Sequence, residues 1–71
     1  MMRFVTYAIN HNRKIRMIYL RDNKIYAKTV TVLAQNDEGI TVQISAKKPA
    51  IVLALADILS CDYARGDHGE E

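Results

Sequence analysis

The sequence has one cysteine, one proline, three glycines and no tryptophan among its 71 residues. The single cysteine, Cys61, excludes an intrachain disulfide and fits a reducing compartment. The longest apolar stretch covers only residues 50–56, whereas a helix needs about 20 apolar residues to cross a bilayer. We therefore predict no membrane span. Polar residues at positions 10–12 interrupt the N-terminal segment, so we expect no secretory signal and a cytoplasmic protein.

Groupings that carry catalytic or metal chemistry are also missing. The three glycines are scattered, which excludes a phosphate-binding glycine loop. His11 and His68 are far apart in the sequence, and no Cys, His and carboxylate residues have metal-ligand spacing. Residues 60–62 read Ser-Cys-Asp, but successive strand residues point to opposite faces and cannot act as one unit. We therefore expect no enzyme, no metal and no cofactor.

The chain is long enough for one small domain. Hydrophobic residues make up 49% and charged residues 25%, a mixture too apolar for a disordered chain. A chain of this size buries about 60% of its unfolded surface, which leaves no room for a large substrate cleft. We predict a single domain over residues 1–64. Residues 65–71 contain no large apolar residue and predict a flexible acidic tail.

Charge is distributed unevenly along the chain. Residues 1–48 contain nine Lys and Arg against three Asp and Glu, a balance of +6. Residues 49–71 contain one Arg against five acids, a balance of −4. The net charge of +2 therefore conceals a basic body and an acidic end.

Apolar spacing predicts one helix followed by a hairpin. Residues 4, 5, 8 and 9 fall on one face of a helix over 2–10, which the Asn-His-Asn of residues 10–12 ends. Residues 13–21 and 24–34 alternate or are β-branched and predict two strands. Asp22 and Asn23 accept positive φ at low cost and suit a two-residue loop. That loop places Tyr19 opposite Tyr26 and Met17 opposite Lys28.

Three further strands complete the predicted domain. Residues 36–39 form a turn in which Gly39 takes positive φ, and residues 40–44 alternate as a strand. A turn at 46–49 leads to a strand over 51–55, and a single helical turn or tight corner at 56–57 leads to a strand over 58–63. Five short strands with one apolar face each are best satisfied by a mostly β (α+β), partly open small barrel, whose end or seam the helix covers. The expected core is Phe4, Ala8, Ile15, Met17, Val30, Val32, Ile40, Val42, Ile44, Leu53 and Ile58.

This order of residues resembles a known group of proteins. An Ala8-Ile9 pair on a helix precedes a basic turn and a strand with Ile15, Met17 and Tyr19 at alternate positions. A Val-rich strand through residues 30–33 and a closing segment over 51–58 follow. Over residues 4–63 the pattern is similar to WYL-type domains and to YolD-like small proteins of bacteria and phages. The third strand lacks the Trp-Tyr-Leu triplet that names the first group.

The resemblance implies an SH3/Sm-like barrel preceded by a helix. It also implies a regulatory role that involves a ligand or nucleic acid. The basic position that family members often carry before the closing strands corresponds to Lys47 or Lys48.

Basic and aromatic residues gather on the predicted hairpin. Small barrels hold single-stranded nucleic acid by placing cations along phosphates and rings against bases. The alternative is a solvated charged surface that blocks edge-to-edge pairing of strands. The candidate nucleic-acid-binding residues are Arg13, Lys14, Arg16, Lys24, Tyr26, Lys28, Lys47 and Lys48.

The segment 51–55 is apolar at every position, although a half-buried strand should alternate. Val52 and Ala54 are the apolar residues at positions where alternation calls for polar ones, and either the helix or another chain covers them. A homodimer through this strand or the helix is the second alternative. The sequence thus predicts a regulatory binding module for nucleic acid or a nucleic-acid-processing partner. A protein-interaction module that self-associates, or docks on a regulator through apolar strand and helix surfaces, remains the alternative.

Overall fold

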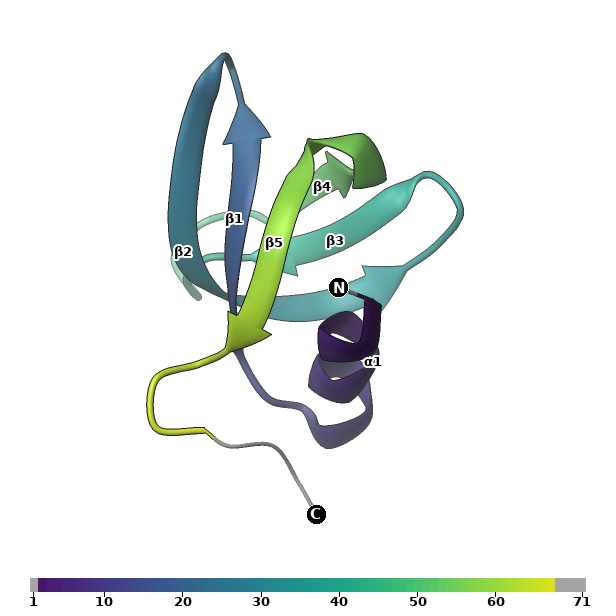
Figure 1. The fold of residues 1–71 in the computed structure, drawn as a ribbon, viewed down its shortest axis with the longest axis vertical. Coiled ribbons are helices and arrows are strands. Elements are labelled where there is room, and N and C mark those ends of the chain that lie inside the picture. The colour runs from purple at the N-terminus through teal and green to yellow at the C-terminus, as the bar shows by residue number, and fades with distance from the viewer. Residues whose placement is uncertain (1, 68–71) are drawn as a thin grey trace.

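The computed structural model describes residues 2–67, which form one helix and five strands (Figure 1). No helix in this range is long and apolar enough to span a bilayer. The predicted order of elements is confirmed. The elements are α1 (Met2–His11), β1 (Ile15–Arg21), β2 (Lys24–Gln35), β3 (Gly39–Gln43), β4 (Ile51–Ala54), the 3-10 turn η1 (Leu55–Asp57) and β5 (Ile58–Tyr63).

The strands form one antiparallel sheet in the order β4-β3-β2-β1-β5. The long strand β2 joins its two halves, because its first part pairs with β1 and its last part with β3. In Figure 1, β2 bends sharply between these parts, so that the β1–β2 hairpin rises above the rest and α1 lies below the sheet. The result is the mostly β (α+β) small barrel that the strand pattern predicts, with β4 and β5 at its edges.

The turn of the first hairpin forms as predicted. Asp22 and Asn23 have φ of 53° and 62°, the left-handed conformation that a two-residue hairpin loop requires at both positions. Tyr19 pairs with Tyr26, and Met17 with Lys28. The loop chemistry therefore fixes which side chains of β1 and β2 share a face.

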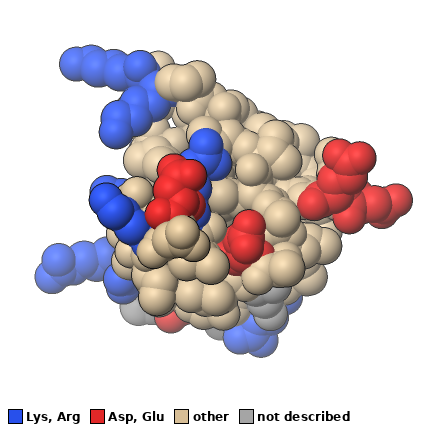
Figure 2. All heavy atoms as spheres, turned by 90° about the horizontal axis from the view of Figure 1, so that it is seen from above, with Lys and Arg blue, Asp and Glu red and all other residues tan. Residues whose placement is uncertain are grey.

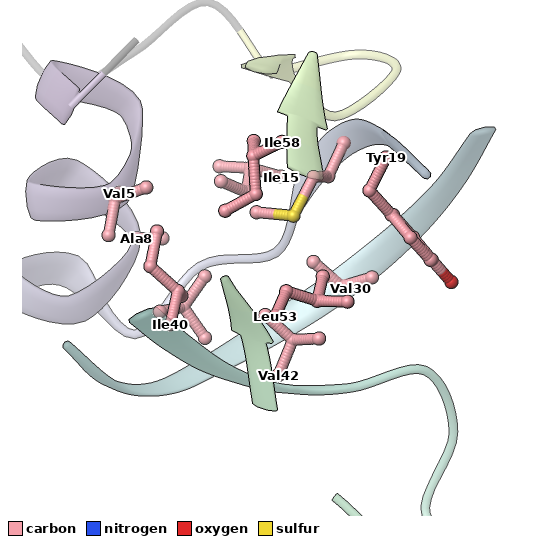
Figure 3. Close-up of a cluster of buried hydrophobic side chains, with 11 residues drawn as sticks. Val5, Ala8, Ile15, Tyr19, Val30, Ile40, Val42, Leu53 and Ile58 are labelled. Carbon is pink, nitrogen blue, oxygen red and sulfur yellow. The ribbon is translucent and has the colours of Figure 1, made fainter. Parts of the chain in front are cut away.

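The core lies between α1 and the concave side of the sheet (Figure 3). Nine of the eleven expected core residues are buried, but Phe4 and Ile44 are only partly buried at its margin. Val5 and Tyr19 take their places, with 0% and 1% of their surface exposed. Val5 is buried because the helix turns this side, rather than that of Phe4, toward the sheet.

Gly39 corrects one predicted turn. We expected positive φ at Gly39, but Gly66 is the described glycine with positive φ. Gly39 is instead the buried first residue of β3, opposite Ala54. A Cβ there would collide with the carbonyl oxygen of Leu53. Glycine is needed because the backbone of β4 approaches closely, not because the chain turns.

A backbone conformation ends α1, and a hydrogen-bonded contact holds the segment after β5. Asn12 has φ of 52°, so an Asn in the left-handed conformation ends the helix as predicted. The Tyr7 hydroxyl donates to both carboxylate oxygens of Asp67, at 2.9 and 2.8 Å. This contact ties the described part of the predicted tail to α1. The rest of that tail, residues 68–71, lies outside the described residues.

Candidate functional site

A pocket of about 230 Å³ lies between the tip of the β1–β2 hairpin and the β3–β4 loop. Its wall combines aromatic rings, three cationic side chains, one carboxylate and two isoleucines. The lining residues are Tyr19, Arg21, Asp22, Tyr26, Lys28, Ile44, Lys48 and Ile51. The hollow lined by Arg16, Met17, Ile18, Ala27, Ser60 and Asp62, by contrast, has no aromatic ring in its wall.

The two tyrosines form the floor of this pocket. They are cross-strand neighbours on the concave face, and their rings stack with centroids 5.5 Å apart and planes inclined by 22°. Tyr19 is buried among core residues, while its hydroxyl points away from the apolar cluster (Figure 3). Burial raises the pKa of Tyr19, and the nearby Arg21 guanidinium opposes that rise. Tyr19 therefore remains a neutral phenol at physiological pH and can donate a hydrogen bond at the pocket.

Register places two of the cations beside the rings. Arg21 follows Tyr19 by two residues on β1, and Lys28 follows Tyr26 by two residues on β2. Residues two apart share one face of a strand, so both side chains lie on the tyrosine side of the hairpin. Lys28 is exposed although it belongs to the concave face and pairs with the buried Met17.

The β3–β4 loop supplies the third cation, Lys48. The loop is folded by two hydrogen bonds: the Gln43 side-chain amide donates to the Lys48 carbonyl at 3.0 Å, and the Lys48 amide donates to the Ser45 carbonyl at 3.1 Å. These bonds hold Lys48 across the pocket from the hairpin. Residues 20 or more positions apart in the sequence thus meet in one site.

The charged side chains are also unevenly distributed over the surface around the pocket. In Figure 2, which looks down on the hairpin tip, most Lys and Arg side chains gather on the left, and a group of acidic side chains projects on the right. The turn between β2 and β3, which contains Asp37 and Glu38, projects to the right in Figure 1. The pocket itself carries three cations against the single carboxylate of Asp22, so it attracts anions.

The eight candidate residues divide between different parts of the surface. Tyr26, Lys28 and Lys48 line the pocket. Lys24 is exposed at the hairpin tip, and Lys47 is exposed in the loop beside Lys48.

The other three candidates lie elsewhere. Arg13 and Lys14 occupy the connection between α1 and β1, and Arg16 lies on the convex face of the sheet opposite Thr29 and Asp62. The structure does not bring these three to the pocket.

Five of the eight pocket residues were not among the candidates: Tyr19, Arg21, Asp22, Ile44 and Ile51. The sequence carried a signal for Tyr19 and Arg21, since the predicted hairpin register puts them on the face of Tyr26. Ile44 and Ile51 had no such signal, because their part in the pocket depends on how the β3–β4 loop folds back.

Metal chemistry finds no support in the part of the chain that the structure describes, where no group of three or more His, Cys, Asp or Glu residues is placed to hold an ion. Cys61 is half-buried on β5 opposite Met17, and burial raises the pKa of its thiol. Searches against models of protein families, curated proteins and solved structures found no match for this chain.

Proposed function

We propose that this protein is a non-enzymatic, regulatory binding module that holds single-stranded nucleic acid at the hairpin pocket. The observation that carries the proposal is the meeting of a stacked tyrosine pair with Arg21, Lys28 and Lys48 around one hollow. Cations that follow phosphates and rings that contact bases are the two elements of single-strand binding. The residue pattern resembling WYL-type and YolD-like proteins supports the regulatory part.

The size of the pocket sets the scale of the ligand. Its volume of about 230 Å³ is below the roughly 300–1,000 Å³ that accommodates drug-sized ligands. It suits one base or sugar-phosphate unit rather than a folded nucleic acid. Neighbouring nucleotides then lie over the exposed Lys24 and Lys47, which flank the pocket on the hairpin tip and the loop.

A single strand fits this surface better than a duplex. Tyr26 is partly exposed at the pocket, and a ring in that position can contact a base only if the base is unstacked from its neighbours. The cations are exposed side chains, so their contribution is electrostatic and falls as salt rises. We therefore expect modest affinity, little sequence preference and a strong dependence on ionic strength.

Fluorescence anisotropy with a labelled single-stranded oligonucleotide tests the proposal. At low salt the protein should bind the single strand more tightly than a duplex of equal length, and raised salt should weaken binding. Tyr26→Ala should reduce affinity about tenfold, because stacking on one ring contributes about 1–3 kcal/mol. Tyr26→Phe, which keeps the ring, should bind nearly as the unchanged protein does. Absence of binding at low salt, or equal binding by Tyr26→Ala, would contradict the proposal.

A further inference from the structure

The hairpin pocket concentrates more positive charge than one phosphate of a nucleic-acid backbone can neutralise. Its wall contains the cations of Arg21, Lys28 and Lys48 and the single carboxylate of Asp22, so three cations less one anion leave a net charge of +2. All three cationic side chains are exposed, and within residues 2–67 none of them forms an ion pair. Their charge is therefore available to a ligand.

The remaining wall of the pocket is apolar and held in place by the core. Tyr19 belongs to the core cluster, and Tyr26, Ile44 and Ile51 are partly buried and packed against it. A wall of this kind can receive the base or the sugar of one nucleotide, while a few polar groups at its edge fix the orientation. Because the volume of about 230 Å³ suits one such unit, the three cations surround the phosphate of a single nucleotide.

A neutral hydroxyl adds a hydrogen-bond donor to these cations. The Tyr19 hydroxyl points away from the apolar cluster (Figure 3). The Arg21 guanidinium lies close enough to oppose the rise that burial causes in the pKa of Tyr19. A guanidinium and a neutral O–H therefore meet at this side of the pocket, and both can donate to the oxygens of one phosphate.

We propose that the pocket binds the end of a single strand through a terminal phosphate, at either the 5′ or the 3′ end. The inference rests on the proposed function and adds which part of the strand the pocket takes. An internal phosphodiester carries one negative charge, whereas a terminal phosphate carries about −1.5 to −2 at pH 7 and three acceptor oxygens. The terminal group is therefore the better match to the wall charge of +2.

Two exposed lysines outside the pocket serve the rest of the strand. Lys24 lies at the hairpin tip and Lys47 in the β3–β4 loop, and neither lines the pocket. Both can meet internal phosphates, which every single strand has. We therefore expect these two lysines to contribute equally to strands with and without a terminal phosphate, and the pocket cations to distinguish between them.

Fluorescence anisotropy with four single-stranded ligands of one sequence, each labelled on an internal base, tests the inference. One linear strand has a 5′ phosphate, one has a 3′ phosphate and one ends in hydroxyls only. The fourth is a closed circle, which has as many phosphates as the phosphorylated strands, all of them internal. At least one phosphorylated strand should bind about tenfold more tightly than the hydroxyl strand and the circle, because the additional charge-assisted hydrogen bonds form only with a terminal phosphate.

A pair of matched variants locates the source of this preference. Lys28→Gln removes one pocket cation and should reduce the preference from about tenfold to about threefold or less. Lys24→Gln is the control, because it makes the same substitution on the same strand but outside the pocket wall. It should weaken binding of all four ligands by a similar factor and leave the preference unchanged. Circular dichroism confirms that both variants are folded.

The outcomes separate this inference from the proposed function. Equal binding of the phosphorylated strands, the hydroxyl strand and the circle would overturn the inference and leave single-strand binding intact. A preference that Lys28→Gln does not reduce, or that Lys24→Gln removes, would also overturn it, because the terminal phosphate would then bind outside the pocket. Absence of binding by every ligand at low salt would contradict the proposed function as well.

Discussion

Tyr19 and Tyr26 face each other across the β1–β2 hairpin with ring centroids 5.5 Å apart and planes inclined by 22°. This stack joins the two strands of the hairpin. Tyr19 is buried against the apolar core, whereas Tyr26 is partly exposed at the pocket. An aromatic pair of this kind adds about 0.5–1.5 kcal/mol beyond the area that it buries. The core therefore holds the ring that is offered to a ligand.

Tyr19 should ionise only above its ordinary pKa of 10.0, because burial disfavours the phenolate. Between the pKa of the unfolded and of the folded state, the folded state binds more protons, so stability falls as pH rises through this window. Tyrosinate absorbance followed during an alkaline titration measures the shift. Arg21→Gln should raise the pKa of Tyr19 further, since Arg21 lowers it. A Tyr19 that titrates at or below 10.0 would contradict the buried placement of its ring.

Cys61 should react slowly with thiol reagents. Burial raises the pKa of this thiol above its ordinary value of 9.0. The reactive thiolate is therefore scarce at neutral pH. Reaction with a disulfide reagent should be slower in the folded protein than in urea, where the thiol is free. Equal rates in both conditions would show that Cys61 is not half-buried.

Gly39→Ala should destabilise the protein by about 2 kcal/mol, because the new Cβ meets the Leu53 carbonyl and overpacks the β3–β4 contact. Urea denaturation measures the change in the free energy of unfolding. Gly66→Ala is the comparison: its φ of 86° strains an alanine, but nothing lies within 4 Å of the new Cβ. That variant should lose about 1 kcal/mol. A neutral Gly39→Ala would show that β4 does not approach β3 so closely.

Tyr7→Phe should lower the free energy of unfolding by about 1 kcal/mol, because it removes the hydroxyl that donates to the Asp67 carboxylate. The ring should keep its edge-on contact with Tyr63, whose centroid lies 5.2 Å away. Faster backbone hydrogen exchange at residues 64–67 is the accompanying sign that this segment is released from α1. If exchange there is unchanged, the segment is held by other contacts.

Local chemistry accounts for most of the fold that the sequence predicted. Asp22-Asn23 specifies a hairpin loop, and the loop specifies the register that pairs Tyr19 with Tyr26. Alternation identifies the buried face of each strand, and η1 occupies the corner that was expected at residues 56–57. Each of these features depends on residues close together in the sequence, which is why it could be predicted.

The sequence did not predict features that depend on backbone far away along the chain. Gly39 looked like a turn glycine because its neighbours are polar, yet its role is set by β4. Part of the candidate site could be predicted, because residues two apart on a strand share a face and this places Tyr26 and Lys28 together. The position of Lys48 could not be predicted, because it depends on the folded β3–β4 loop, in which the Gln43 side chain donates to the Lys48 carbonyl.

Charge reversal at the pocket tests the central proposal most directly. Lys28→Glu with Lys48→Glu is compared with Arg3→Glu and Lys14→Glu, a control that changes the net charge equally away from the pocket. In anisotropy titrations with a labelled single strand at low salt, we predict that the pocket variant loses at least about tenfold in affinity. The control should lose much less. Equal losses in the two variants, or a loss confined to the control, would contradict a binding site at the pocket.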